Sequence, residues 1–341
     1  MQIPNSWVEL ADKVVGKGRI VMLIGGVDTG KTTLCRYLIG EAVRAGIKSA
    51  AVDADVGQSW IGPPTCIGMK LVSGEKDLNG EPDGLYFVGS ISPPGHLLDC
   101  VVGTKLLVEE ALSQNAEFVA IDTTGLIDGD IGLALKRSKI LSICPTDIVL
   151  IQVGGELEPL AGEIEPIRRW RVHKMKRAEQ VTRKSREYRI SHRKAMFDGY
   201  FSKCLPIDFD FTSLRSQRSL FLNGRPLPDR ELRRLSHLIG DIVLYAESSG
   251  GHLFAVVPDR VGREKIEDIC RTMNLRRLEI RQPEWFEGLL VGLLDRDGRV
   301  ISLGIIERVN FTSRKLTIRC QDGSERAVIV QFSRFRGDRG C

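Results

Sequence analysis

The chain has 341 residues, of which 42% are apolar and 27% are charged, and its net charge is +5. These values are typical of a globular protein and leave room for a large domain plus a smaller one. No apolar run reaches the length of a membrane span, and residues 1–12 carry neither a basic leader nor an apolar signal core, so we expect no membrane partner and no export.

Strands and helices alternate along the first half of the chain. Continuous apolar, β-branched runs predict strands at residues 19–26, 48–55, 84–90, 116–125 and 147–155. Helical periodicity predicts helices at residues 6–15, 31–46, 97–114 and 132–144. This alternation predicts an α/β fold, in which a mostly parallel sheet is covered by helices on both faces.

A strongly basic segment, residues 167–194, follows these elements. It carries twelve Lys and Arg residues against two Glu, so the rest of the chain has a net charge of −5. We expect the segment to form one or two helices. A concentrated positive charge on a mildly acidic body indicates a partner with several phosphates.

The pattern changes after about residue 205. Asn223-Gly224 predicts a hairpin, and residues 229–248 read as a helix running into a strand. From residue 285, β-rich runs separated by Asp-Gly pairs predict an antiparallel meander. We therefore expect a first domain over residues 1–205 and a smaller, β-rich α+β domain over residues 206–341.

The stretch GGVDTGKT, residues 25–32, fits the phosphate-binding pattern G-x-x-x-x-G-K-[ST] between a predicted strand and a predicted helix. Backbone N–H groups of such a loop converge on phosphate oxygens. Lys31 can bridge the β- and γ-phosphates of a nucleotide, and Thr32 can ligate Mg²⁺. No N-K-x-D motif occurs, which favours ATP, or a loose choice of base, over strict use of GTP. The predicted nucleotide-binding residues are Gly25, Gly26, Val27, Asp28, Thr29, Gly30, Lys31, Thr32 and Thr33.

Three acidic residues lie on or at the end of predicted strands. Asp53 and Asp55 are two residues apart and share one face of their strand, and Asp122 ends a buried strand as a Walker B acid does. A carboxylate there could hold a Mg²⁺-bound water, accept a proton from an attacking hydroxyl, or cap a turn. The predicted metal-binding set is Thr32, Asp53, Asp55 and Asp122.

Four ordered motifs carry a resemblance: GGVDTGKTTLCRYL, VDADVGQSWIGPP, FVGSISPPGH and IDTTGLIDG. Together they resemble the polynucleotide 5′-hydroxyl kinases, a family that includes the kinases of pre-mRNA cleavage and ribosomal RNA processing and their compact archaeal relatives. The resemblance covers residues 15–205 and extends to the meander after residue 285. It implies a P-loop fold with a helical basic lid, residues 165–201, and phosphoryl transfer from ATP to the 5′-OH end of RNA or DNA.

The resemblance also implies roles for single residues. Asp55 matches the acid that faces the attacking 5′-hydroxyl, and Lys31, Arg189 and Arg193 complete the predicted catalytic set. The predicted nucleic-acid contacts are Gln58, Ser90, Ser92, Thr124, Leu126 and Arg186. Leu126 stands where the best-known branch of the family has a tryptophan that can stack on a base, so the grip on the first nucleotide is weaker here or lies elsewhere.

Two alternatives stay open. A regulatory P-loop NTPase would hydrolyse its nucleotide to change partners in RNA processing, without kinase activity. The second alternative is a small-molecule kinase, but a small substrate would leave the basic segment unexplained. The eight cysteines are scattered without a C-x-x-C pair, which predicts free thiols and a cytoplasmic protein. Nothing in the sequence indicates an obligate protein partner.

Overall fold

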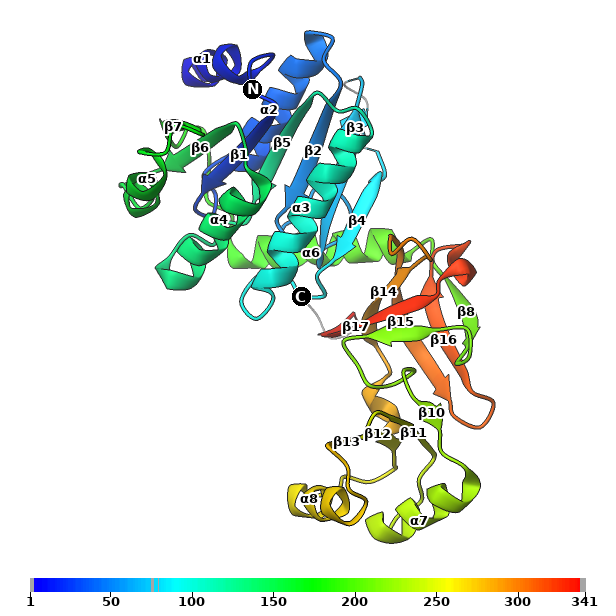
Figure 1. Cartoon of the computed structure of the whole chain (residues 1–341). Coiled ribbons are helices and arrows are strands. Elements are labelled where there is room, and N and C mark those ends of the chain that lie inside the picture. Colours follow the sequence, from blue (N-terminus) through cyan, green and yellow to red (C-terminus); the bar gives the residue numbers. More distant parts are fainter. Residues whose placement is uncertain (1–2, 75–76, 79, 338–341) are drawn as a thin grey trace. The chain divides into compact units, whose positions relative to one another are not determined.

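A mostly parallel sheet forms the centre of the first part of the chain in the computed structural model, which describes residues 3–74, 77–78 and 80–337 (Figure 1). Within these residues the sheet has seven strands in the order β4-β3-β2-β5-β1-β6-β7. Its strands are β1 (Ile20–Gly25), β2 (Ser49–Ala54), β3 (Cys66–Val72), β4 (Gly84–Phe87), β5 (Phe118–Thr123), β6 (Asp147–Gln152) and β7 (Arg171–Lys176). The pairs from β2 through β7 are parallel, which confirms the prediction, while the unpredicted β3 and its neighbour β4 add an antiparallel edge.

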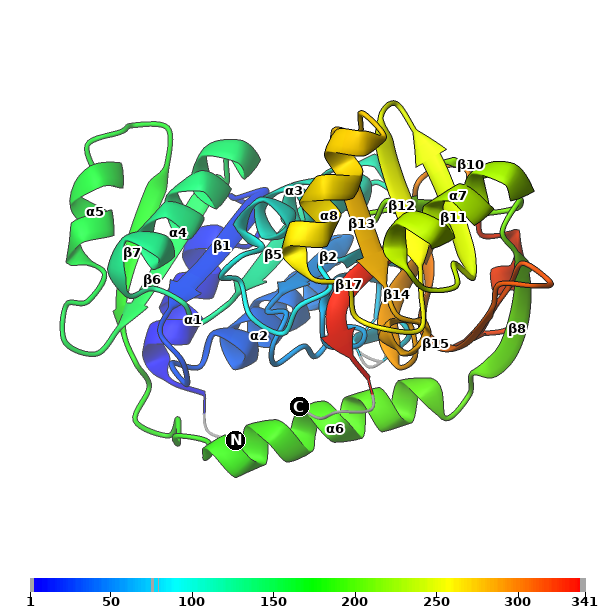
Figure 2. The same ribbon diagram turned by 90° about the horizontal axis from the view of Figure 1, so that it is seen from below.

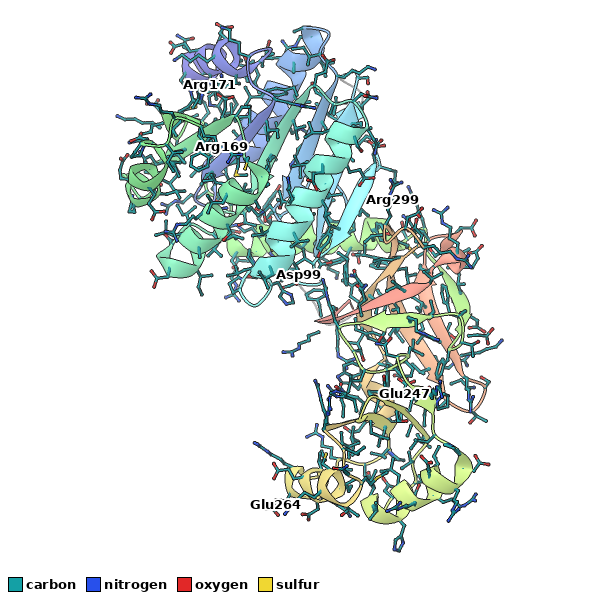
Figure 3. The ribbon with its side chains drawn as sticks, in the orientation of Figure 1. Asp99, Arg169, Arg171, Glu247, Glu264 and Arg299 are labelled. Carbon is teal, nitrogen blue, oxygen red and sulfur yellow. The ribbon has the colours of Figure 1, made fainter. Side chains whose placement is uncertain are left out.

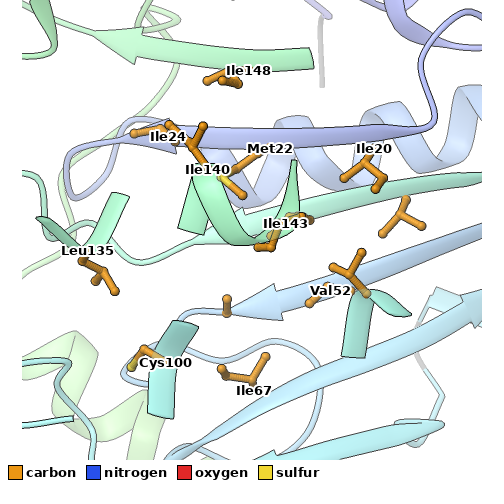
Figure 4. Packing of buried hydrophobic residues seen from close by; sticks show 14 of the residues in the cluster. Ile20, Met22, Ile24, Val52, Ile67, Cys100, Leu135, Ile140, Ile143 and Ile148 are labelled. Atoms are coloured by element: carbon orange, nitrogen blue, oxygen red, sulfur yellow. The ribbon is translucent and has the colours of Figure 1, made fainter. Parts of the chain in front are cut away.

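Helices cover both faces of this sheet, because alternate side chains of each buried strand point to opposite faces. On one face, α1 (Asn5–Val14) and α2 (Lys31–Arg44) bury Trp7 and Leu34 against β1 and β5. The other face is covered by α3 (Leu97–Ser113), α4 (Gly129–Ile143) and α5 (Glu158–Ile164). Figure 4 shows this second layer, in which Ile140 and Ile143 of α4 pack beside Met22 of β1. The two layers fix the strand ends that carry the candidate site.

The basic segment corrects one expectation. We predicted one or two helices, but its first part is the edge strand β7, and helix begins only with α6 (Arg186–Phe201). β7 pairs with β6 on one side, and most of its side chains are exposed or half-buried. Figure 2 shows α6 as one continuous helix. An edge strand of this kind has no apolar stripe to identify it, which is why its charge pattern resembled a helix surface.

The chain divides into two units, the first ending at Phe197 and the second beginning at Asp198, inside α6. The predicted domain boundary at 205/206 lies just after this helix. Residues 1–2 and 338–341, which form the ends of the two predicted domains and include Cys341, lie outside the described residues.

The described part of the second unit holds two sheets, ordered β8-β16-β15-β14-β17-β9 and β10-β11-β12-β13. The larger contains β8 (Leu205–Asp210), β9 (Arg215–Gln217), β14 (Leu289–Leu294), β15 (Val300–Asn310), β16 (Lys315–Cys320) and β17 (Ile329–Arg336). The smaller contains β10 (Arg225–Pro226), β11 (Tyr245–Ser249), β12 (His252–Val256) and β13 (Arg277–Arg281). The remaining elements are α7 (Asp229–Ile239), α8 (Arg263–Thr272) and the 3₁₀ turns Pro283–Trp285 and Ser324–Arg326.

The predicted antiparallel meander is confirmed, since β14, β15 and β16 pair in succession and β17 returns beside β14. The predicted hairpin at Asn223-Gly224 is wrong, because the strands on either side of this turn, β9 and β10, belong to different sheets. One aromatic core joins the two sheets, with Phe221 in ring contact with Tyr245 and Phe286. None of the described helices combines the length and the apolar character that a bilayer crossing requires.

Candidate active site

The loop between β1 and α2 is built to approach phosphate. Gly30 immediately precedes α2 with φ +90°, a left-handed conformation that favours glycine, and a Cβ there would lie 2.9 Å from Val181. Lys31 is almost fully buried at the first turn of the helix, and its Nζ donates to the Gly26 carbonyl at 2.6 Å. The loop therefore combines backbone N–H groups, a helix N-terminus and an ammonium group at one place.

Thr32 and Asp122 meet beside this loop, because β5 pairs with β1 in parallel register. The Thr32 hydroxyl donates to Asp122 Oδ2 at 2.6 Å. Asp122 Oδ1 is buried and finds no hydrogen-bond partner among the described residues. Burial raises the pKa of Asp122 to about 6, although the Lys31 charge and the Thr32 hydrogen bond oppose the shift. An unpartnered carboxylate oxygen next to a threonine hydroxyl fits a Mg²⁺ shell that is completed by water and nucleotide phosphates.

No group of three or more His, Cys, Asp or Glu side chains in the described ranges is arranged to hold a metal ion by itself. This agrees with how Mg²⁺ is bound beside phosphates, through one or two protein ligands rather than an all-protein cage. Of the predicted metal set, Thr32 and Asp122 are the two side chains in direct contact.

Asp53 and Asp55 occupy different environments at the end of β2. Asp53 is fully buried, and its two oxygens accept the backbone N–H groups of Asp55, Trp60 and Ile61 at 2.6–3.1 Å. Burial and the charge of Asp122 raise the pKa of Asp53 well above its usual range, against the effect of these donors. The side chain therefore holds the loop in shape, and its predicted place in the metal site stays a prediction.

Asp55 is half-buried, and its Oδ1 accepts the N–H groups of Gly57 and Gln58 at 3.0 and 3.2 Å. This turn orients the carboxylate at the carboxyl end of β2, the edge of the sheet that also carries Asp122. The Gln58 amide in turn donates to the Arg189 carbonyl of α6 at 3.3 Å. The D-x-G-Q loop is therefore joined to the lid segment.

The lid segment contacts the phosphate loop through Asp28. The Arg189 guanidinium donates to Asp28 Oδ2 at 2.6 Å, and the backbone N–H of Lys184 donates to the same oxygen at 3.0 Å. Arg193 lies one turn further along α6, and its Nε is buried without a described partner. Arg186, at the start of the helix, is exposed. The structure thus brings Arg189 to the loop, whereas within the described residues Arg193 and Arg186 form no hydrogen bond or ion pair with it.

The other predicted nucleic-acid contacts are dispersed. Ser90 and Ser92 hydrogen-bond to each other in the loop after β4. The Thr124 hydroxyl and carbonyl accept from Lys136, and Leu126 packs partly buried against the apolar core. The predicted roles of these residues at a nucleic-acid end stay predictions.

Sequence reasoning missed two lysines of α4, Lys136 and Lys139, which are both fully buried. Lys136 Nζ donates to the Thr124 carbonyl at 2.5 Å and to the Thr123 hydroxyl at 3.0 Å, so it fixes the strand end after Asp122. Burial lowers the pKa of both lysines, and for Lys136 the charges of Lys139 and Lys31 add to the effect. A sequence signal existed, because both positions fall on the helix stripe formed by Leu135, Ile140 and Ile143.

The parallel sheet, the glycine-rich loop at the start of α2 and the Thr32–Asp122 pair define the chain as a P-loop NTPase. A family model described as the mRNA cleavage and polyadenylation factor CLP1 P-loop matches residues 25–203. The chain belongs to this family, which confirms the resemblance drawn from the four motifs.

Relatives and solved structures agree with this assignment. A Pyrococcus furiosus protein described as a polyribonucleotide 5′-hydroxyl-kinase is 33% identical over 319 residues, covering 93% of this chain and 87% of that protein. A Methanocaldococcus jannaschii protein of the same description is 32% identical over 325 residues, with 93% and 87% covered. The solved structure of a Clp1p–Pcf11p complex matches with a TM-score of 0.64 at 14% identity, over 97% of this chain and 79% of that one, and supports the fold.

Proposed function

We propose that this chain is an ATP-dependent polynucleotide 5′-hydroxyl kinase, which transfers the γ-phosphate of ATP to the 5′-OH end of RNA. One observation carries the chemistry: the buried Lys31 ammonium lies within electrostatic reach of three carboxylates, Asp122, Asp55 and Asp28. Burial lowers the pKa of Lys31, and these three charges oppose that shift. Each carboxylate belongs to a different structural part: the Walker B strand, the D-x-G-Q loop and the phosphate loop that holds the lid.

This arrangement gives each group a separate task. The loop N–H groups and Lys31 bind the β- and γ-phosphates, and Thr32 and Asp122 would hold Mg²⁺, which neutralises phosphate charge when it is bound. Asp55 accepts the proton of the 5′-hydroxyl as that oxygen forms its bond to the γ-phosphorus. The bond from the γ-phosphorus to the bridging oxygen breaks, and ADP leaves. Arg189 and Arg193 stabilise the charge on the phosphoryl group during transfer.

The acceptor is a nucleic-acid end rather than a small alcohol. The basic segment and the curated descriptions of the relatives as polyribonucleotide kinases support this choice. We propose RNA as the first acceptor to test, with DNA ends as the comparison. The cysteines of the described residues are all free thiols, which supports action in a reducing, cytoplasmic environment.

The decisive experiment uses ATP labelled at the γ-phosphate and oligonucleotides with a 5′-OH end. We expect label on the oligonucleotide only when ATP, Mg²⁺ and the wild-type chain are present. An oligonucleotide already bearing a 5′-phosphate is the control and should stay unlabelled. Release of labelled phosphate without labelled oligonucleotide would instead identify a regulatory NTPase, the alternative that the P-loop alone leaves open.

A further inference from the structure

The second unit contains a small cavity that is lined by no residue of the four family motifs. It has a volume of about 240 Å³ and is lined by residues of both sheets. The residues that matter for its chemistry are Phe211, Arg215, Arg225, Tyr245, Glu247 and Arg314. Figure 3 labels Glu247, which belongs to β11 of the smaller sheet.

Buried side chains form the floor of the cavity. Phe211 and Tyr245 meet edge to face with ring centroids 5.4 Å apart, and both rings are buried. The Tyr245 hydroxyl donates to Glu247 at 2.8 Å, and the N–H of Asn223 donates to the other oxygen of that carboxylate at 3.3 Å. Glu247 is 2% exposed, and burial raises its pKa. The Glu247 carboxylate therefore stabilises the turn at Asn223, and it forms no ion pair with an arginine of the described residues.

The wall at Gly224 has no room for a side chain. A Cβ at this position would lie 2.9 Å from both the N and the O atom of Ser248. The turn that enters the smaller sheet therefore lies close against β11, and Arg225 follows it as the first residue of β10.

Three guanidinium groups surround the opening, and each comes from a different element. Arg215 begins β9, Arg225 begins β10, and Arg314 lies in the turn between β15 and β16. All three residues are exposed, and in the described part of the chain no carboxylate lies within 4.0 Å of their guanidinium nitrogens. Other arginines of this unit do have carboxylate partners, namely Arg263, Arg271, Arg277, Arg281 and Arg319.

We propose that this cavity binds a phosphodiester group of the acceptor strand, downstream of the 5′ end that is phosphorylated. The proposal rests on the proposed kinase function. Guanidinium groups bind phosphate oxygens through paired N–H donors. Arg215 donates to the Leu214 carbonyl at 3.1 Å, and none of the three guanidinium groups around this opening has a carboxylate partner among the described residues. The cavity is smaller than a typical drug-sized site of roughly 300–1,000 Å³, so it fits one phosphate with its sugar and not a complete nucleoside triphosphate.

The test compares two double variants of equal charge. Arg225→Gln/Arg314→Gln removes two of the cavity guanidinium groups. Arg230→Gln/Arg296→Gln removes two exposed arginines that do not line it. Each is assayed for phosphoryl transfer to a 5′-OH dinucleotide and to a 5′-OH RNA of about twenty nucleotides.

We expect the cavity variant to raise KM for the long RNA about tenfold or more, with kcat and the dinucleotide reaction unchanged. The slope of log affinity against log salt should fall by about 0.7, since the loss of one phosphate contact to a single strand contributes about 0.7. The control variant should stay close to the wild type. An equal rise in KM for both acceptors, or an equal effect in both variants, would overturn the proposal.

Binding is also measured without catalysis, using a labelled RNA that already carries a 5′-phosphate. If AMP or poly-glutamate displaces this RNA as effectively as unlabelled RNA does, the cavity takes free nucleotides or acidic protein segments, and the proposal fails. If the wild type binds RNA through these arginines but labels no acceptor, the kinase function fails while the phosphodiester site stands. The two failures are therefore distinguishable.

Discussion

Replacing Asp55 by asparagine separates catalysis from folding. Asparagine keeps the Oδ1 acceptor that receives the N–H groups of Gly57 and Gln58 at 3.0 and 3.2 Å, so the turn survives. We expect a change in unfolding free energy of about 0.5 kcal/mol or less. The amide cannot accept the proton of the 5′-hydroxyl. A positioned general base contributes about 10²–10⁴ in rate, which corresponds to roughly 3–5 kcal/mol of barrier.

Asp53→Asn is the matched control, because it makes the same chemical change two residues away. Both oxygens of the fully buried Asp53 accept backbone N–H groups. In asparagine an NH₂ group replaces one of these oxygens, so a donor then faces at least one backbone N–H donor. Each donor left unpaired costs about 1–3 kcal/mol. We expect Asp53→Asn to lower the melting temperature by about 2–4 °C per kcal/mol and to retain transfer in the molecules that stay folded.

The assay is single-turnover transfer of labelled γ-phosphate to a 5′-OH RNA at saturating ATP and Mg²⁺. Thermal melts and nucleotide binding are measured on the same samples. We predict normal melting, normal ATP binding and lost transfer for Asp55→Asn. For Asp53→Asn we predict a lowered melting temperature, with ATP binding and transfer retained in the folded molecules. A rate for Asp55→Asn within about threefold of the wild type would refute the assignment of Asp55 as the base.

Three further predictions concern other parts of the site. Because the pKa of Asp122 is raised to about 6, apparent Mg²⁺ affinity should fall about tenfold per pH unit below 6 and level off above it; a flat Mg²⁺ titration series down to pH 5 would contradict this. In the absence of metal, the raised pKa of Asp122 adds to the free energy of unfolding. This contribution is complete below pH 3.8 and is lost as pH rises through 6. Arg189→Ala should lower kcat about 10³-fold, whereas Arg186→Ala should chiefly raise KM for RNA; equal kinetics for the two variants would remove Arg189 from the mechanism. Lys136→Ala should cost about 2–4 kcal/mol in a denaturant titration, since it leaves a cavity and an unpaired Thr124 carbonyl, and wild-type stability would show that this contact is dispensable.

The parts that sequence predicts well are those in which local chemistry decides the structure. The phosphate loop needs glycines and a lysine at fixed spacing, and the buried strands β1, β2 and β5 read as continuous apolar runs because both of their faces are covered. Asp122 was readable as a Walker B acid since it ends such a run.

The parts that sequence predicts poorly depend on distant partners. The edge strand β7 has no apolar pattern, and the Asn223-Gly224 turn joins strands whose pairing is decided by two different sheets. Asp53 and Asp55 share one face of the predicted strand, but only the folded loop brings the backbone N–H groups of Trp60 and Ile61 to the Asp53 carboxylate. Lys136 lies on the buried stripe of α4, where the helical pattern predicts an apolar residue such as leucine.

The contact between Asp28 and Arg189 has a consequence for nucleotide binding. A carboxylate within the nucleotide loop already offers the lid arginine a negative oxygen at 2.6 Å. In the proposed mechanism, an incoming nucleotide competes with the Asp28 carboxylate for this guanidinium. Binding of ATP would then replace the contact between Asp28 and Arg189 with one between Arg189 and the triphosphate.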